Sequence, residues 1–581
     1  MALAYGNFHE LSHQIRFLLF EIGIGLPQNR IDYYITLAHR DALKRLQHAA
    51  LAEGLIEAPI ATHHVHDLID QLQVSLKKTL PASQFFQWNT IRDELDESIA
   101  NDALAQAYKQ CWNTQIRNEA NGYHSLWSWM NKTQTAYETL LFLEQWGCTG
   151  NSYQPAFRAK TGLSRREVLQ NSPEFQSKIS IHWCALNKNK VSIPAQGLKF
   201  NDLIKREFPT EFLLWRERVL LHHLNPEDYY PLPVHPWQWR NQLQTRCSAL
   251  IDNKSLVLLP HHQTLIPSMS LDAMLPPDCP RALINLTSTL NTSDSSTADS
   301  FALKTRNTEV FRWLNSLLKA NYHYKNTVFL ADELSAIGVK DDTLPDYVQN
   351  KLSASLRQNP IDFLKSHQKA VPLTSLFSNS PLSNTPLIIE IIKESGLEPL
   401  NYLANYCRTI LFGALHLMLK HGVILEAQHH HILVIFADNT PQGLIYKDLE
   451  QIVIGEHLFF NAEEQRGLPI DTRLNTGNLN LLSTRFIQNT LQNNIKLWIE
   501  ALNTACQIPV IQLWSCVHQV IHSLLNELVQ EFNPHLIEWL KQLLLNEAWR
   551  HQCSLTMRLS SNSYKNTNVH EVNPFTLLKD Y

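Results

Sequence analysis

Apolar residues recur at helical spacing near both ends of the chain. Ile91, Leu95 and Ile99 follow at four-residue intervals, with acidic residues between them. This pattern predicts an amphipathic helix. A second stripe lies near the other end, where Asn533-Pro534 interrupts it before another helical segment. That stripe consists of Val517, Ile521, Leu524 and Leu528.

The middle of the chain, from about residue 150 to 310, has a different pattern. Short apolar runs at 255–259 and 282–286 are separated by proline clusters and by the polar segment NTSDSSTADS. Such runs predict short strands joined by turns. A second loose stretch, residues 378–386, predicts a linker into the C-terminal region.

One β-hairpin is predicted in more detail. Residues 432–436 are continuously apolar, 437–442 have turn chemistry, and 443–446 are apolar again. If Phe436 pairs near Gly443, Ile432 pairs near Lys447. The hairpin then brings Glu426, His430 and His431 towards Lys447 and Asp448, and two carboxylates beside imidazoles suit a cation or phosphate site.

Composition limits the chemistry. The chain has 581 residues but only 17 glycines, and neither G-x-x-x-x-G-K-[ST] nor G-x-G-x-x-G occurs in it. A bound nucleotide would therefore depend on side chains. The formal net charge of -4 provides no basic field for a nucleic acid or an anionic membrane, so a small ligand or a protein partner is expected.

No apolar run reaches the roughly 18 to 20 residues that span a bilayer, and the first residues lack a signal-peptide pattern. The nine cysteines form no C-x-x-C pair and are odd in number. These features predict a cytoplasmic protein with reduced thiols.

The segment LPVHPWQW (232–239) contains HPWQ, although His235 and Trp237 in it could serve the fold alone. This and several other segments resemble the IucA/IucC-type synthetases, which make siderophores independently of non-ribosomal peptide synthetases. The other matching segments occur in the family's order along the chain. They are RDELDESIAN (92–101), IPSMS followed by LINLTSTLN, HGVILEAQHHHILV followed by IYKDLEQI, and MRL with a later NPF.

The resemblance implies an α+β fold with a three-part cupped-hand architecture. A helical thumb would cover residues 1–145, a central antiparallel β-rich fingers domain 146–375, and a largely helical palm with the hairpin 376–581. The family uses ATP and Mg²⁺ to adenylate a carboxylate of citrate or a related polycarboxylic acid, and an amine, hydroxylamine or alcohol then displaces AMP. A homodimer is also implied.

The family's GHPxHPxxKxRxG loop aligns with residues 150–162, where both histidines are replaced and the two cations are exchanged as Arg158 and Lys160. The exchange keeps the charge but changes the geometry of the donors. By this resemblance, Arg158 and Lys160 are candidate catalytic and acid-binding residues.

The family's S-x-R-T segment aligns with residues 268–271, where Ser268 and Ser270 would bind the nucleotide. Arg281 lies two positions beyond the expected lysine and is a candidate for nucleotide binding and catalysis. Thr287 is retained and would bind the acid, whereas the arginine expected four residues later is Asn291.

The C-terminal motifs supply the remaining candidates. Glu426 and Asp448 would hold Mg²⁺, and Gln428, in place of the family's histidine, would contact the acid. The nucleotide-binding candidates of this segment, which replace or match family positions, are His430, His431, Lys447 and Asp448.

The run His429-His430-His431 also suggests a zinc site. Consecutive strand residues point to opposite faces, however, so the three histidines are not expected to bind one ion.

Two functional hypotheses follow. The first is an ATP-dependent ligase that condenses a polycarboxylic acid with an amine, hydroxylamine or alcohol. The second is a non-catalytic relative whose cleft binds a polycarboxylate, a ferric siderophore or a partner enzyme. The replacement of the S-x-R-T arginine favours the second, because one charge-assisted contact to phosphate contributes roughly 1.5–3 kcal/mol.

Overall fold

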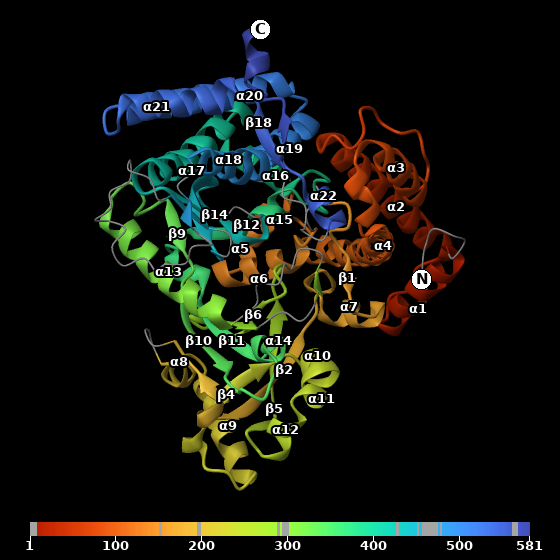
Figure 1. Ribbon diagram of the computed structural model, residues 1–581, viewed down its shortest axis with the longest axis vertical. Coiled ribbons are helices and arrows are strands. Elements are labelled where there is room, and N and C mark those ends of the chain that lie inside the picture. The colour runs from red at the N-terminus through yellow and green to blue at the C-terminus, as the bar shows by residue number, and fades with distance from the viewer. Residues whose placement is uncertain are drawn as a thin grey trace.

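The computed structural model describes residues 8–149, 154–194, 199–286, 291–292, 301–425, 429–449, 452–455, 475–476, 479–560 and 568–580. Its helices and strands form three regions around a central area (Figure 1). The N-terminal helices lie on one side, a large sheet at the lower end, and the C-terminal helices at the upper end. The mixed fold with a central antiparallel sheet confirms the predicted class.

The N-terminal region is helical. Its helices are α1 (Phe8–Glu21), α2 (Gln28–Ala52), α3 (Val65–Thr79), α4 (Trp88–Glu119), α5 (Leu126–Thr133) and α6 (Ala136–Trp146). The predicted stripe of Ile91, Leu95 and Ile99 lies on α4 and is buried.

Three acidic residues of α4, Glu94, Asp96 and Asp102, are also buried, which the amphipathic pattern does not show. Asp96 accepts a hydrogen bond from the His66 Nε2 at 2.9 Å, and Glu94 pairs with Arg558 near the C-terminus. α4 is thus linked to His66 in the N-terminal region and to Arg558 near the C-terminus by its charged side chains. Burial strengthens these electrostatic interactions.

The large sheet has eight strands in the order β3-β10-β11-β7-β6-β5-β2-β4, and its pairs are antiparallel. Two of them, β5 and β7, correspond to the runs predicted at 255–259 and 282–286. The strands are β2 (Ile179–Asn187), β3 (Val191–Ser192), β4 (Tyr229–Val234), β5 (Leu256–Pro267), β6 (Ala273–Leu275), β7 (Ala282–Leu286), β10 (Glu333–Val339) and β11 (Ser353–Gln358).

The helices of this part of the sequence mostly lie near the large sheet, whereas α7 lies beside α1 (Figure 1). They are α7 (Arg165–Asn171), α8 (Phe200–Glu207), α9 (Pro209–Leu221), α10 (Pro236–Gln238), α11 (Gln244–Arg246), α12 (Ser248–Asp252), α13 (Phe301–Ala320) and α14 (Asp346–Lys351). β1 (Lys160–Thr161) pairs with β8 (Asn291–Thr292) in a separate two-stranded sheet.

The HPWQ segment has a structural role. His235 caps α10, its Nδ1 accepting the Trp237 backbone N–H at 3.1 Å. The Trp237 indole donates to Glu167 at 2.9 Å, and Trp237 is buried. Of the two interpretations left open, the structure supports the one in which these side chains serve the fold.

A second sheet joins the fingers sequence to the palm sequence. Its order is β12 (Gln368–Pro372), β14 (Ile432–Ala437), β15 (Thr440–Tyr446) and β9 (Val328–Leu330). β9 runs parallel to β15, and a Cβ added at Gly443 on β15 would lie 2.7 Å from the Thr327 carbonyl oxygen. Glycine at 443 is thus required by this close approach. The domain boundary expected between 375 and 376 stays a prediction.

The predicted hairpin is confirmed, with a tighter turn and a different register. Ala437 pairs with Thr440, so Asp438 and Asn439 form a two-residue loop in which both φ angles are positive. Asp and Asn tolerate this conformation. Ile432 pairs with Tyr446 rather than Lys447, and a register shift follows Ile435.

The C-terminal region is mainly helical, as predicted. Its elements are α15 (Leu373–Leu376), α16 (Leu387–Ser395), α17 (Pro399–His421), β13 (Val423–Ile424), β16 (Val453–Gly455), β17 (Asn475–Thr476), α18 (Leu479–Phe486), α19 (Lys496–Cys506), α20 (Val510–Leu528), α21 (Pro534–Lys541), β18 (Trp549–Gln552), α22 (Ser554–Leu559) and β19 (Asn568–Glu571). The stripe from Val517 to Leu528 is buried on α20, and Asn533 caps α21.

Residues 378–386, expected to be a loose linker, are instead packed. Ser378 and Ser380 are buried, Asn379 bridges to Pro386, and the Pro381 carbonyl accepts a hydrogen bond from Arg117 at 2.9 Å. These contacts satisfy polar groups that a linker would leave to water.

No helix among the described residues combines the length and apolarity that crossing a membrane requires.

Asn439 gives a test of how the hairpin is held. Its side chain accepts from the Trp127 indole at 2.7 Å and donates to the Glu394 carbonyl at 3.1 Å, while φ is +61°. We expect Asn439→Gly to lower the free energy of unfolding by about 1–3 kcal/mol through the lost hydrogen bonds. Asn439→Ala should cost about 1 kcal/mol more, because alanine disfavours positive φ.

Urea unfolding followed by circular dichroism measures both values. Asp438→Gly is the matched control, since Asp438 has positive φ but an exposed side chain. Equal effects of the alanine and glycine variants at 439 would contradict the backbone part of this prediction.

Candidate functional site

Arg158 and Lys160 lie together in a buried ion-pair group beside α4. The Arg158 guanidinium donates to Asp102 at 2.8 Å and to Glu174 at 3.0 Å, and the Lys160 ammonium reaches the same Glu174 oxygen at 2.8 Å. A further Arg158 N–H donates to the Cys148 carbonyl at 3.2 Å. The two predicted cations are therefore brought together.

Their charges are compensated inside the protein. Burial by itself raises the pKa of the Glu174 carboxyl, but Lys160 and Arg158 outweigh it and hold that pKa below its usual range. Asp102 and Glu174 thus provide two negative charges opposite two positive ones. A polycarboxylate bound here would have to share these cations with the protein's own carboxylates.

Ser268, Ser270 and Lys447 meet around Glu144, which lies near the end of α6. The Lys447 ammonium pairs with one Glu144 oxygen at 2.6 Å. The other oxygen accepts the Met269 backbone N–H at 3.0 Å. The hydroxyls of Ser268 and Ser270 are 2.9 Å apart in the same turn.

Both residues of this ion pair are buried, with relative exposures of 2% for Glu144 and 6% for Lys447. In such surroundings an ion pair is strong, and either partner alone would carry a large desolvation penalty. Glu144 therefore holds the end of β15 against the turn that follows β5.

Asp448 faces Arg357, a buried residue of β11. One Arg357 nitrogen lies 3.4 Å from Asp448 and 3.5 Å from Glu333 of β10. The same Glu333 oxygen accepts the Ser355 hydroxyl at 2.6 Å and the Asn285 amide at 3.2 Å. Strands β7, β10 and β11 of the large sheet thus present a polar group to the residue that follows the hairpin.

Sequence reasoning missed Glu144, Glu333 and Arg357. Glu144 follows an apolar helical pattern, and Glu333 and Arg357 lie in short strands far apart in the sequence. The available signal is that each of these charged residues lies within an apolar segment. Such a residue is expected to be buried, and buried charged residues are almost always paired.

His429, His430 and His431 form a single 3-10 turn before β14, so the argument from strand alternation does not apply to them. The rings of His430 and His431 lie 4.1 Å apart. The Lys447 backbone N–H donates to the His431 carbonyl at 2.8 Å, which confirms that the hairpin brings the histidines to Lys447.

Burial keeps these imidazoles neutral. It lowers the pKa of His429 to about 4, and burial together with neighbouring histidines and Lys447 holds the pKa of His430 well below 6.5. The pKa of His431 is lowered in the same way by burial, Lys447 and Arg357. Neutral rings donate and accept hydrogen bonds but do not replace a missing cation.

Arg281 lies apart from the contacts above. It is exposed just before β7, its carbonyl accepts the Asn359 N–H at 2.8 Å, and among the described residues it forms no hydrogen bond or ion pair with Lys447 or Asp448. Thr287, Glu426 and Gln428 lie outside the described residues. The site assignments as a whole remain predictions.

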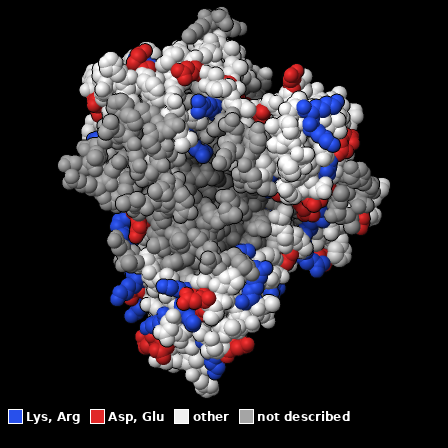
Figure 2. Space-filling view, viewed as in Figure 1, with Lys and Arg blue, Asp and Glu red and all other residues white. Residues whose placement is uncertain are grey.

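Lys and Arg side chains are interspersed with Asp and Glu over the described part of the face in Figure 2. The antiparallel sheet thus meets the C-terminal region at buried cations, each of which is paired with a carboxylate.

Comparison with known proteins agrees with this class. Residues 139–378 match the IucA/IucC family model, and residues 400–567 match the model described as ferric iron reductase FhuF-like transporter. The family-model match to residues 139–378 confirms the predicted resemblance to the IucA/IucC family.

One curated relative is the citryl-spermidine/3,4-dihydroxybenzoyl-citryl-spermidine:spermidine ligase of Bacillus anthracis. It is 23% identical over 373 residues, which are 62% of this chain and 55% of that protein. The chain spans about half to three fifths of the length of the first curated relatives it matches.

Solved structures share the fold. The petrobactin biosynthesis protein AsbB of B. anthracis has a TM-score of 0.70 at 17% identity, over 85% of this chain and 80% of that one. ATP-bound aerobactin synthetase IucA of Klebsiella pneumoniae has a TM-score of 0.68 at 19% identity, over 87% and 85%.

The Glu144–Lys447 pair is testable by a double-mutant cycle. We expect Glu144→Gln and Lys447→Met each to lower the free energy of unfolding by about 3–5 kcal/mol, since each leaves one buried charge unpaired. The double variant should lose clearly less than the sum, because no unpaired charge remains. Urea unfolding of the four proteins measures the coupling, and additive losses would contradict the pairing.

The histidine turn predicts a pH dependence. The pKa of His429 is about 4 in the folded protein and about 6.5 when unfolded. Above pH 6.5 its contribution to stability is complete. As the pH falls from 6.5 towards 4, the unfolded chain takes up a proton that the folded protein excludes, so stability falls by up to about 1.4 kcal/mol per pH unit.

His429→Gln should therefore flatten the loss of stability between pH 6.5 and 5, measured by urea unfolding at each pH. His535→Gln, at an exposed position, is the control. An unchanged slope in His429→Gln would show that His429 does not titrate in this way.

Proposed function

We propose that this protein is an ATP-dependent ligase of siderophore biosynthesis. It condenses a polycarboxylic acid such as citrate with an amine, hydroxylamine or alcohol. The observation that carries the proposal is the meeting of Lys447, Asp448 and Arg357 at the junction of hairpin and sheet. Cations beside a carboxylate are what phosphoryl-group chemistry requires.

The family's reaction gives roles to these groups. A carboxylate oxygen of the acid attacks the α-phosphorus of ATP, pyrophosphate leaves, and an acyl-adenylate forms. The amine nitrogen or hydroxyl oxygen then attacks the acyl carbon, AMP leaves, and the nucleophile loses a proton. Lys447 and Arg357 would offset the negative charge on phosphate, with Ser268 and Ser270 as hydrogen-bond donors.

The acid would lie nearer to Arg158 and Lys160, with Thr287 and Gln428 as further contacts. Arg281, expected at the nucleotide, would have to act from the exposed start of β7. The neutral rings of His430 and His431 suit hydrogen bonds to the nucleotide rather than charge compensation.

Mg²⁺ would be held by Asp448 with Glu426. Its fit is supported by the donor set, since Asp448 and Glu333 present carboxylate oxygens within reach of one guanidinium. The buried Glu333 Oε2 makes no hydrogen bond among the described residues. Oxygen ligands are those that Mg²⁺ prefers, and the ion would supply positive charge to the phosphates.

Mg²⁺ would contribute more to ATP binding here than in a site whose cations are unpaired. Lys447 is paired with Glu144, and Arg357 with Asp448 and Glu333. ATP entering alone would compete with these carboxylates for the cations. We therefore expect ATP to bind much more weakly without Mg²⁺.

The second candidate is a non-catalytic relative that binds a polycarboxylate, a ferric siderophore or a partner enzyme. The observation in its favour is this same pairing of each buried cation, together with Leu271 at the threonine position of S-x-R-T. We further propose a homodimer acting in the cytoplasm; the exposed Phe17 and Phe20 of α1 support a contact surface.

Pyrophosphate release separates the two candidates. The assay combines MgATP and citrate with a panel of diamines, hydroxylamines and amino alcohols. We expect release with at least one combination, and Arg357→Lys should lower kcat/KM by about tenfold or more, because lysine keeps the charge but cannot contact two carboxylates as a fork does.

Arg408→Lys is the matched control, since Arg408 forms an exposed pair with Glu527. Asp448→Asn sets the background rate. If no combination exceeds that background, and calorimetry detects citrate but not MgATP, the ligase proposal fails and the binding alternative is supported.

A further inference from the structure

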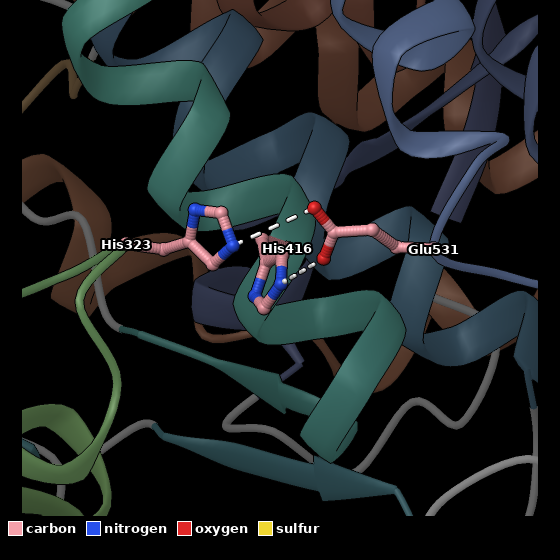
Figure 3. Close-up of side chains that lie close together, drawn as sticks. All are labelled: His323, His416 and Glu531. Atoms are coloured by element: carbon pink, nitrogen blue, oxygen red, sulfur yellow. Dashed lines mark hydrogen bonds and ion pairs between the residues drawn. The ribbon is translucent and has the colours of Figure 1, made fainter.

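Two histidines and a glutamate from three distant segments face one another outside the candidate cleft (Figure 3). His323 lies in the connection between α13 and β9, His416 lies on α17, and Glu531 follows α20. Each histidine directs a ring nitrogen towards the Glu531 carboxylate. Nothing in the proposed ligase chemistry uses these residues.

The ligand atoms are spaced as a metal ion requires. His323 Nε2 lies 3.5 Å from one Glu531 oxygen, and His416 Nε2 lies 3.3 Å from the other. One ligand atom from each residue can be chosen so that all lie within 4.8 Å of one another. In a tetrahedral zinc site with bonds of ~2.0–2.1 Å, neighbouring ligand atoms are ~3.3 Å apart.

The surroundings orient the His416 ring. Its Nδ1 contacts the Tyr324 hydroxyl, which leaves Nε2 on the side of Glu531. Metal-binding histidines commonly use the second ring nitrogen for such a hydrogen bond, which fixes the ring and the tautomer. When Nδ1 donates its proton to Tyr324, the Nε2 lone pair faces the carboxylate, and a cation between them relieves the repulsion.

The side-chain exposures suit a site that is anchored inside and open to water. The His416 side chain is 1% exposed and that of His323 11%, whereas Glu531 is 44% exposed. Phe412 and Phe532 pack against the histidine rings. The rings are thus held in place while one coordination position stays accessible.

The charge state of His416 also suits a ligand. Burial and the neighbouring His323 lower the pKa of His416 to about 4, against the opposing effect of Glu531. Lys420 acts in the same direction as His323. The ring is therefore neutral at physiological pH, and neutral imidazole is the form that binds a metal.

We propose that His323, His416 and Glu531 bind one divalent transition-metal ion of the zinc type, with water as the fourth ligand. Two nitrogens and one carboxylate favour Zn²⁺ and similar ions over Mg²⁺ or Ca²⁺, which prefer oxygen ligands throughout. The ion ties the α13–β9 connection and the end of α20 to α17.

This tie has a consequence for the fold. β9 pairs with β15, Lys447 directly follows β15, and α17 leads to β13. An ion at this position therefore stabilises the packing on which the hairpin depends, without contacting the cleft. Its effect should appear in stability rather than in the chemistry of the ligase.

Metal binding by the untagged full chain tests the proposal. The metal-free protein is titrated with Zn²⁺ by calorimetry, and with Co²⁺ while the visible absorption is recorded. We expect one ion per chain, tetrahedral-type Co²⁺ bands, and a raised melting temperature. Glu531→Gln and His323→Ala should each weaken Zn²⁺ binding by about tenfold or more.

Two variants control for the loss of a carboxylate or an imidazole elsewhere. Glu527→Gln removes a carboxylate one helical turn away that pairs with Arg408, and His522→Ala removes an exposed imidazole of α20. Both should bind Zn²⁺ as the wild type does. Circular dichroism checks that the site variants are folded.

Two outcomes would contradict the metal-site proposal. Absent Zn²⁺ binding by the folded wild type, or binding unchanged in both Glu531→Gln and His323→Ala, overturns the proposal. In either case the three residues form a hydrogen-bonded ion-pair group only. Mg²⁺-dependent pyrophosphate release is independent of these outcomes, so the ligase proposal is tested separately.

Discussion

The buried ion pair between Glu144 and Lys447 determines how the hairpin meets the large sheet. Glu144 uses one oxygen for the Lys447 ammonium and the other for the Met269 N–H. A helix of the N-terminal region thus holds a residue of the palm and a turn of the fingers at once. Because Glu144 and Lys447 are both buried, a shift of one leaves a charge without a partner, at a cost of several kcal/mol.

The other cations of the candidate site are likewise buried and paired with carboxylates. Arg158 and Lys160 face Asp102 and Glu174, and Arg357 faces Asp448 and Glu333. A low dielectric makes such pairs strong and makes unpaired charges costly. These buried charges are therefore held in fixed positions and largely cancel one another.

Long-range contacts also join the ends of the chain to this centre. α4 buries carboxylates that bind Arg158 and Arg558, and Glu53 of the segment after α2 accepts the backbone N–H groups of Leu555 and Thr556 at 2.6 and 2.7 Å. The second sheet pairs strands from both sides of the expected fingers–palm boundary. The three regions share one framework of buried polar contacts.

Much of the architecture followed from the sequence itself. Periodicity predicted α4, α20 and the hairpin, and apolar runs between prolines predicted β5 and β7, because such patterns report on local backbone geometry and on which face is buried. The pairing of the predicted hairpin placed Lys447 and Asp448 near the histidines. Asp438-Asn439 gave the tight turn less clearly, since several turn residues compete in that stretch.

Only the tertiary structure revealed the partners of the charged residues. Glu144, Glu333 and Arg357 lie tens to hundreds of positions from the groups they contact, and no periodicity encodes a contact between segments so distant. The sequence by itself determined the types of element, their order and the supply of charged side chains. Packing decided which charges were buried and paired, because desolvation acts on a side chain only once its neighbours are in place.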